Sequence, residues 1–109
     1  MSPIAQIDPK ELAAKLARPE AERPFLLDVR NPDEHARVRI AGCTLIPLGE
    51  LGRRVEEVPR DREIVVYCHH GMRSLNAAGL LAQAGIAASS LRGGIDAWAQ
   101  LIDTTLPRY

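Results

Sequence analysis

One stretch near the middle of the chain restricts the fold more than any other. The segment 64–67 reads Ile-Val-Val-Tyr and predicts a buried strand, because β-branched and aromatic residues favour strands. Cys68 follows this strand directly, and a loop containing Gly71 comes next. The segment 75–84 is rich in Ala and Leu and closes at Gly85, which is typical of a helix and its end. A strand, a tight loop and a helix in this order indicate one βα unit of an α/β fold.

The other segments alternate between strand and helix patterns. Asp8, Pro9 and Glu11 mark a helix start, with an N-cap, a proline at the first helical position and a glutamate three residues after the cap. The apolar run 25–29 predicts a second buried strand. Further predicted elements are strands at 44–46 and 89–91, weak helical patterning at 48–58, a turn at 92–94 and a final helix from Ile95. This alternation predicts a mostly parallel sheet with helices on both faces and with ligands at the carboxyl ends of its strands.

Length and composition bound the function. The chain has 109 residues, of which 46% are hydrophobic and 26% charged, so a single domain over residues 1–109 with its own core is expected. Basic and acidic residues number 14 each, and the resulting net charge of zero argues against a nucleic-acid or anionic-membrane partner. No apolar window is long enough to cross a membrane, and the first residues resemble no signal peptide. The expected location is the cytoplasm.

The cysteines point to chemistry at one loop. Cys43 and Cys68 are too few for a disulfide scaffold and wrongly spaced for a zinc site. Cys68 stands where a loop opens a helix, and there the free backbone N–H groups and the helix dipole favour a thiolate. Gly71 allows a tight loop with inward amides, while Arg73 can orient an incoming anion or lock the loop to a carboxylate. We therefore predict an active site on this loop.

Three motifs extend this reading along the chain. They comprise Leu27-Asp28-Val29-Arg30 with Glu34, Ile40-Ala41-Gly42 and Ile46-Pro47; then Cys68-His69-His70-Gly71-Met72-Arg73-Ser74; and finally Leu91-Arg92-Gly93-Gly94-Ile95 with Trp98. Together they resemble the signatures of the rhodanese family of sulfurtransferases, in the order that the family has. The chain departs from the family at Arg39, where a histidine usually precedes the isoleucine of the first motif. We interpret this departure as a surface or packing substitution.

The resemblance implies both an architecture and an activity. It implies a five-stranded sheet, with a short strand near residues 4–6 that no local pattern indicates. It also implies a cysteine that takes sulfane sulfur from a donor, holds it as a persulfide and passes it to a thiophilic acceptor. On the matching positions the catalytic residue is Cys68, and the substrate-binding residues are His69, His70, Gly71, Met72 and Arg73. No cofactor and no metal are expected, because inward amides hold the terminal sulfur anion without either.

The sulfur donor, the sulfur acceptor and the functional class of the protein remain open at this point. The expected partners are a small-molecule donor such as thiosulfate or a persulfide, a thiol or cyanide acceptor, and a sulfur-relay protein. A cysteine phosphatase or arsenate reductase shares the cysteine and arginine, but the phosphatase-type loop encloses five residues, whereas Cys68 and Arg73 enclose four. The shorter ring suits a sulfur atom better than a tetrahedral phosphate. A non-catalytic binding module of the same fold usually lacks the cysteine, which is present here.

Other residues near these motifs are assigned structural roles. Asp28, Arg30 and Glu34 are predicted to form an ion-pair set that braces the loop. Cys43 is interpreted as a small packing residue, and Trp98 as part of the core. The two adjacent histidines of the loop lack a third metal ligand nearby in the sequence, so they are interpreted as lining the loop or facing solvent.

Overall fold

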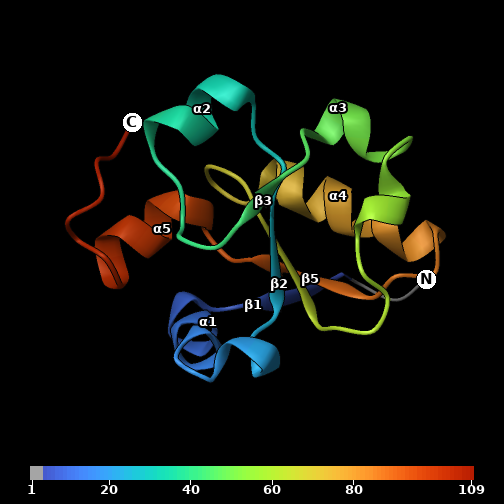
Figure 1. Cartoon of the computed structure of the whole chain (residues 1–109). Helices are drawn as coiled ribbons and strands as arrows, with labels where there is room; N and C mark the ends of the chain where they lie inside the picture. The colour runs from blue at the N-terminus through green and yellow to red at the C-terminus, as the bar shows by residue number, and fades with distance from the viewer. Residues whose placement is uncertain (1–3) are drawn as a thin grey trace.

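A computed structural model describes residues 4–109 and has a five-stranded sheet at its centre (Figure 1). All of its strand pairs are parallel, and the order across the sheet is β1-β5-β4-β2-β3. The strands are β1 (Ala5–Ile7), β2 (Phe25–Asp28), β3 (Thr44–Leu45), β4 (Ile64–Tyr67) and β5 (Ala88–Leu91). The predicted α/β class with a five-stranded parallel sheet is confirmed.

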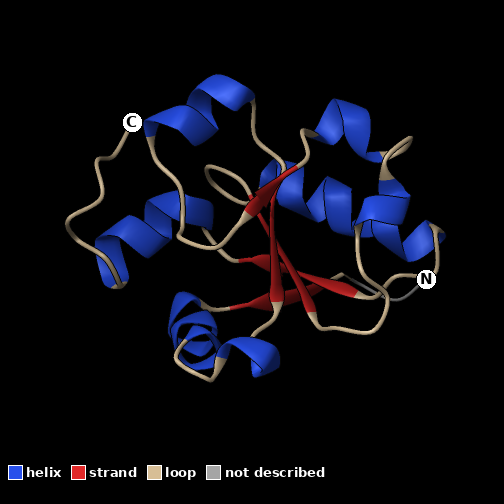
Figure 2. Ribbon diagram, viewed as in Figure 1, coloured by secondary structure: helices blue, strands red, loops and turns tan. Residues whose placement is uncertain are grey.

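Helices cover both faces of the sheet, as the ribbon in Figure 2 shows. On one face lie α3 (Leu48–Leu51) and α4 (Met72–Gln83), and on the other lie α1 (Pro9–Leu16) and α5 (Gly94–Leu101). The connections include α2 (Pro32–Arg37) between β2 and β3, and two 3-10 turns, η1 (Glu20–Glu22) and η2 (Val55–Glu57). Among residues 4–109, every helix is too short or too polar to cross a membrane.

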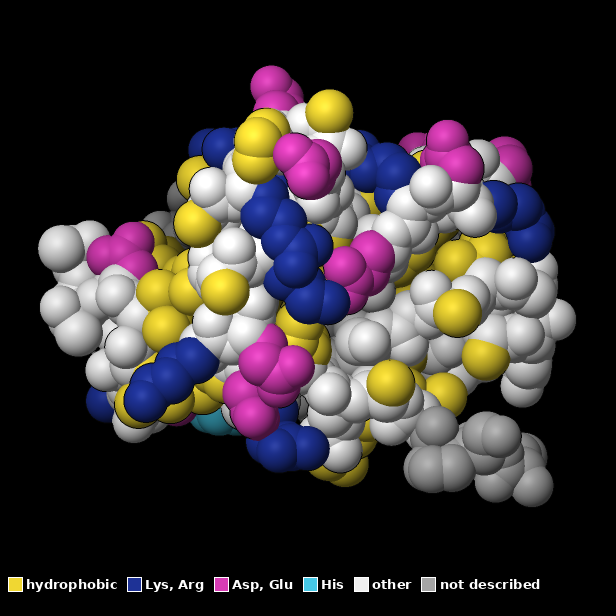
Figure 3. Space-filling view, turned by 90° about the horizontal axis from the view of Figure 1, so that it is seen from below, with side chains coloured by type: hydrophobic (Ala, Val, Ile, Leu, Met, Phe, Trp, Pro, Cys, Tyr) yellow, Lys and Arg dark blue, Asp and Glu magenta, His cyan; other side chains and the backbone are white. Residues whose placement is uncertain are grey.

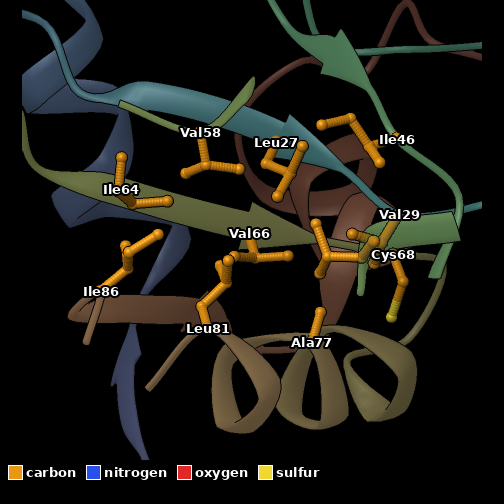
Figure 4. Close-up of a cluster of buried hydrophobic side chains, with 11 residues drawn as sticks. Leu27, Val29, Ile46, Val58, Ile64, Val66, Cys68, Ala77, Leu81 and Ile86 are labelled. Atoms are coloured by element: carbon orange, nitrogen blue, oxygen red, sulfur yellow. The ribbon is translucent and has the colours of Figure 1, made fainter. Parts of the chain in front are cut away.

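Strand β4 is buried along its whole length, because helices cover both faces of the sheet. Its side chains alternate between the faces: Ile64 and Val66 join the cluster under α4, whereas Val65 joins the cluster under α1 and α5. Cys68 continues this alternation and belongs to the cluster under α4 (Figure 4). The strand therefore directs the Cys68 side chain toward the helix that follows it.

The order of the strands brings the ends of β2 and β4 together. Asp28 at the end of β2 pairs with Tyr67 at the end of β4. Strand β3 flanks β2 on one side and β4 flanks it on the other, so the chain changes direction across the sheet at this point. In open parallel sheets, ligands bind beyond the carboxyl ends of strands at such a position. Arg30 and Cys68, which follow these two strands, stand at that edge.

Most predicted elements are present with shifted ends. The predicted strands at 25–29, 44–46 and 89–91 each differ from the observed strands by one residue. The helix predicted for 75–84 begins three residues earlier, at Met72, because Gly71 in a left-handed conformation serves as its N-cap. The strand implied near residues 4–6 is β1, displaced by one residue. The patterning at 48–58 corresponds to α3 and η2, which a turn separates.

Helix α2 is absent from the sequence expectations, although its start carries the same signature as α1. Asn31 is the N-cap, Pro32 is the first helical residue, and the Glu34 side chain accepts a hydrogen bond from the Asn31 N–H at 3.0 Å. The helix has six residues, and none of them is buried. Such a short, exposed helix has no apolar face, so its sequence shows no apolar periodicity that would predict it. It matters for the site because it carries Glu34 to the edge where Cys68 lies.

Candidate active site

The sulfur of Cys68 lies inside the loop that begins α4. The side chain is 1% exposed. The backbone N–H groups of Gly71 and Ser74 donate hydrogen bonds to Sγ, at 3.1 and 3.3 Å. They stand at the N-terminal end of α4, where N–H groups have no partner within the helix and the helix dipole is positive. This arrangement stabilises negative charge on the sulfur.

Gly71 and Ser74 also determine the shape of the loop. Gly71 has a φ of 109°, a conformation in which a residue with a side chain is strained. The Ser74 hydroxyl donates a hydrogen bond to the Gly71 carbonyl oxygen at 3.1 Å. A second hydrogen bond of 2.7 Å joins the Ser74 hydroxyl to that of Ser90. These contacts fix the turn that directs both N–H donors at the sulfur.

The sequence expectations include neither serine among the site residues. Ser74 lies in the second motif, and its place in the first turn of α4 could have revealed its N–H as a donor. Ser90 comes from β5 and stands opposite Val66 of β4. Only the order of strands in the sheet brings Ser90 to this loop, so no local pattern could have found it.

The start of α5 supports the other side of the loop. The backbone N–H of Ile95 donates a hydrogen bond to the carbonyl oxygen of Cys68 at 2.8 Å. The N–H of Asp96 bonds the carbonyl oxygen of His69 in the same way at 3.0 Å. Gly94 has a φ of 62°, and a Cβ at this position would overlap both carbonyl groups. The glycine turn predicted before the last helix therefore lets a second helix approach the loop backbone.

Arg73 reaches from α4 to α2 and forms a forked ion pair. Its terminal nitrogens donate hydrogen bonds to the two carboxylate oxygens of Glu34, at 2.6 and 2.9 Å. Chiefly through these bonds, Arg73 holds the pKa of Glu34 at about 2, below its ordinary value of 4.5. Of the two roles foreseen for Arg73, the lock to a carboxylate is present. Orientation of an incoming anion stays a prediction.

This pair is expected to make stability depend on acidity. The pKa of Glu34 is lower in the folded protein than its ordinary value of 4.5. The ion pair of Glu34 with Arg73 therefore contributes fully to the free energy of unfolding when the pH is above 4.5. The contribution is lost as the pH falls through about 2. We expect Glu34→Gln to lower the free energy of unfolding by about 1–2 kcal/mol at pH 7. This value allows for solvent screening of the ion pair, because Arg73 is partly exposed.

Urea denaturation at pH 7, 4 and 2.5 measures this effect. The difference between wild type and Glu34→Gln should shrink as the pH falls. Glu56→Gln is the matched control, since Glu56 is exposed and forms no ion pair within residues 4–109. A difference for Glu34→Gln that stays constant over this pH range would contradict the role of the ion pair.

A second ion pair is buried behind the first. The carboxylate of Asp28 accepts hydrogen bonds from Nε and Nη2 of Arg30 at 3.0 and 2.9 Å, and both side chains are fully buried. Nη1 of Arg30 donates to the hydroxyl of Tyr109 at 2.7 Å. That hydroxyl donates to Oε2 of Glu34 at 2.8 Å. The predicted ion-pair set is therefore present as two pairs, and Tyr109 joins them.

The two loop histidines differ in their surroundings. The ring of His69 is partly buried and stacks on the rings of His70 and Tyr109, with 3.9 Å between centroids in each case. Burial and the neighbouring His70 lower the pKa of His69. The His70 side chain is 65% exposed, and its Nε2 lies 3.8 Å from a carboxylate oxygen of Asp96. His69 thus forms part of the loop wall, whereas His70 faces solvent.

The predicted substrate-binding residues stand in different relations to the sulfur. Gly71 contacts it directly through its backbone N–H. Arg73 is engaged with Glu34, and Met72 at the start of α4 is 72% exposed. Binding of a substrate by these residues and by the two histidines stays a prediction.

Among residues 4–109, two groups of side chains have the chemistry of metal ligands. They are Asp28, His35 and Cys43, and His69, His70 and Asp96; within each group the ligand atoms lie within 4.8 Å of one another. The third ligand for the histidines comes from α5, which is why it is not evident in the local sequence. Arg30 and Arg108 already pair with the two carboxylates, at 2.9 Å in each case. These ion pairs favour structural roles for both groups.

Cys43 lies on the other face of the sheet from Cys68. It is half-buried, and the hydroxyl of Tyr67 donates a hydrogen bond to its Sγ at 3.3 Å. Burial raises the pKa of the Cys43 thiol. Since the thiolate is the reactive form, these surroundings favour a packing role for Cys43.

A surface groove of about 700 Å³ lies away from the loop of Cys68. It occupies the space between η1, the segment after α2, and α5, and its lining includes Leu16, Leu26, Ile40, Trp98 and Leu106. Figure 3 views the underside of the molecule, where hydrophobic side chains gather among charged ones. Trp98 is 7% exposed and packs in the core as predicted. Arg39 is exposed at this groove and donates a hydrogen bond to the backbone oxygen of His35, which agrees with the interpretation of Arg39 as a surface residue.

Comparison with known proteins shows the family of this chain. Residues 8–101 match the family described as Rhodanese-like domain. The chain belongs to the rhodanese-like domain family. A protein of Allochromatium vinosum named Sulfurtransferase is 38% identical over 98 residues, which make up 89% of this chain and 90% of that protein.

Two further relatives show how this rhodanese-like domain occurs in other settings. The probable adenylyltransferase/sulfurtransferase MoeZ of Mycobacterium tuberculosis is 38% identical over 106 residues, which cover 94% of this chain and 26% of MoeZ. The crystal structure of a rhodanese-related protein from Thermoplasma volcanium is 31% identical and matches with a TM-score of 0.80, over 88% of this chain and 91% of that one. The family therefore includes domains of this size alone and within a longer chain.

Proposed function

We propose that this rhodanese-like domain is a sulfurtransferase that carries sulfane sulfur on Cys68 as a persulfide. The observation that carries the proposal is the pair of backbone N–H groups, from Gly71 and Ser74, that donate to the buried Sγ. Donors held in place stabilise an anion without reorganisation during the reaction. The relative named Sulfurtransferase supports the same activity.

The proposed reaction consists of two displacements. The Cys68 thiolate attacks the outer sulfur of thiosulfate; a new S–S bond forms, the S–S bond of thiosulfate breaks, and sulfite leaves with the electron pair. Cyanide or a thiolate acceptor then attacks the outer sulfur of the persulfide. The Cys68 thiolate leaves and is regenerated, and thiocyanate or a new persulfide is released. No external oxidant or reductant is consumed.

The surrounding residues supply charge and rigidity for these steps. The N–H groups of Gly71 and Ser74 hold the negative charge on the sulfur of Cys68 before the first displacement, and we propose that they also hold the charge on the outer sulfur after it. Glu34 raises the pKa of Arg73, and a thiolate at Cys68 adds to this effect. Arg73 therefore stays charged beside the loop, and its positive charge favours an anionic donor such as thiosulfate.

Sulfur transfer and phosphate hydrolysis can be compared directly in the wild-type protein. Four residues separate Cys68 from Arg73, and this small ring is expected to exclude a tetrahedral oxyanion. We expect transfer from thiosulfate to cyanide, measured as thiocyanate, at a rate at least about a hundredfold above hydrolysis of an aryl phosphate. Phosphatase turnover that exceeds sulfur transfer would support the phosphatase alternative instead. If the wild type showed neither activity, the remaining alternative would be a non-catalytic binding module.

The partners follow from the same chemistry. A persulfide on another protein offers the same outer sulfur as thiosulfate, so we propose that the domain also accepts from, or delivers to, a sulfur-relay protein. The name of MoeZ, which joins an adenylyltransferase to a sulfurtransferase, supports such a relay for a related domain.

A further inference from the structure

Tyr109 contacts the loop of Cys68 from a segment outside the family match. The match ends at residue 101, whereas the ring of Tyr109 stacks on the ring of His69 with an angle of 8° between their planes. His69 follows Cys68 directly in the chain. The stacking therefore holds the first part of the loop.

The hydroxyl of Tyr109 holds the other end of the same loop. It donates a hydrogen bond of 2.8 Å to Glu34, whose carboxylate fixes Arg73. Its oxygen also accepts a hydrogen bond of 2.7 Å from the buried Arg30. Arg73 immediately precedes Ser74, one of the two donors to Sγ. The Tyr109 side chain thus acts on both ends of the loop: its ring contacts His69, and its hydroxyl holds Arg73 through Glu34.

The segment that carries Tyr109 has its own attachments. Arg108 forms an ion pair with Asp96 of α5 at 2.9 Å, and Leu106 packs against the core under α5. The guanidinium of Arg37 in α2 lies over the Tyr109 ring, 5.5 Å from its centroid. The segment therefore ties α5, α2 and the loop of Cys68 to one another.

We infer that Tyr109 is a positioning residue for sulfur transfer: its ring and hydroxyl hold the loop so that the N–H groups of Gly71 and Ser74 point at the sulfur. This inference rests on the proposed function. Its ring and its hydroxyl are separable by mutation, because Tyr109→Phe keeps the stacking on His69 and removes both hydrogen bonds. Tyr109→Leu removes the stacking as well.

The test measures amide hydrogen exchange by NMR together with steady-state kinetics. In Tyr109→Leu we expect exchange at Gly71 and Ser74 to be about tenfold faster than in wild type, with β5 amides unchanged. We expect kcat for transfer from thiosulfate to cyanide to fall about tenfold, while KM changes less than about twofold, because the donors act on charge that develops during transfer. The kcat of Tyr109→Phe should lie between those of wild type and Tyr109→Leu, at about a threefold loss.

Leu16→Ala is the matched control, because Leu16 of α1 packs partly buried against the same core from outside the Tyr109 segment. It should lower thermal stability without changing kcat or exchange at the loop. The inference is wrong if Tyr109→Leu exchanges at Gly71 and Ser74 within twofold of wild type, or if its β5 amides accelerate equally. A wild type that transfers no sulfur would overturn the proposed function alone. In that event the exchange rates still decide whether Tyr109 positions the loop.

Discussion

Replacing Cys68 with serine is expected to lower sulfur transfer from thiosulfate to cyanide by at least about a thousandfold. A serine hydroxyl is far less nucleophilic toward sulfur at neutral pH and cannot form the S–S bond that both displacements require. The substitution is nearly isosteric at a site that is 1% exposed, so the fold should survive. Thiocyanate formation measures the effect, and thermal melts confirm that the variant is folded.

Cys43→Ser provides the matched comparison. Cys43 lies on the other face of the sheet, where its Sγ accepts a hydrogen bond from Tyr67. We expect this variant to keep activity within about twofold of wild type and to lose a small amount of stability through packing. Loss of activity in Cys43→Ser together with full activity in Cys68→Ser would reverse the assignment.

Gly94→Ala is expected to lower the free energy of unfolding by about 2–4 kcal/mol. An alanine at a φ of 62° is strained, and its Cβ would overlap the carbonyl groups of Cys68 and His69. Relief of this overlap moves the start of α5 away from the loop and breaks the hydrogen bonds that Ile95 and Asp96 donate. Urea denaturation gives the stability, and sulfur transfer should fall together with it.

Gly49→Ala is the control for this substitution. Gly49 lies in α3, and a Cβ there would meet no atom within 4 Å. Alanine favours helices more than glycine does, so we expect this variant to be unchanged or more stable by up to about 1 kcal/mol. Equal stability changes for the two variants would show that the loop carbonyls do not restrict position 94.

Local patterns were sufficient to predict β4, the loop of Cys68 and α4. The β-branched run of β4 and the glycine before α4 identified a strand, a loop and a helix, because each of these signals acts within a few residues. The parallel sheet followed from the alternation of strands and helices. The short helix α2 could also have been found from its N-cap signature at Asn31, which repeats the one recognised at Asp8.

Residues that depend on tertiary contacts could not be predicted in this way. Ser90 reaches Ser74 only because β5 lies beside β4, and Asp96 approaches the loop only because the glycine turn brings α5 against it. Tyr109 follows the last helix in a segment without regular structure, so no periodicity indicates its stacking on His69. The sequence predicted that Arg73 can pair with a carboxylate and that Glu34 helps to brace the loop, but only the fold shows that these two residues pair with each other.

The most direct test of the central claim is mass spectrometry of the wild-type protein after incubation with thiosulfate. We expect the intact protein to gain the mass of one sulfur atom, which a thiol or cyanide then removes. Peptide mapping should assign this sulfur to Cys68, and Cys68→Ser should gain none. Sulfur found on Cys43 alone, or the same gain of mass in Cys68→Ser, would contradict a persulfide carried by Cys68.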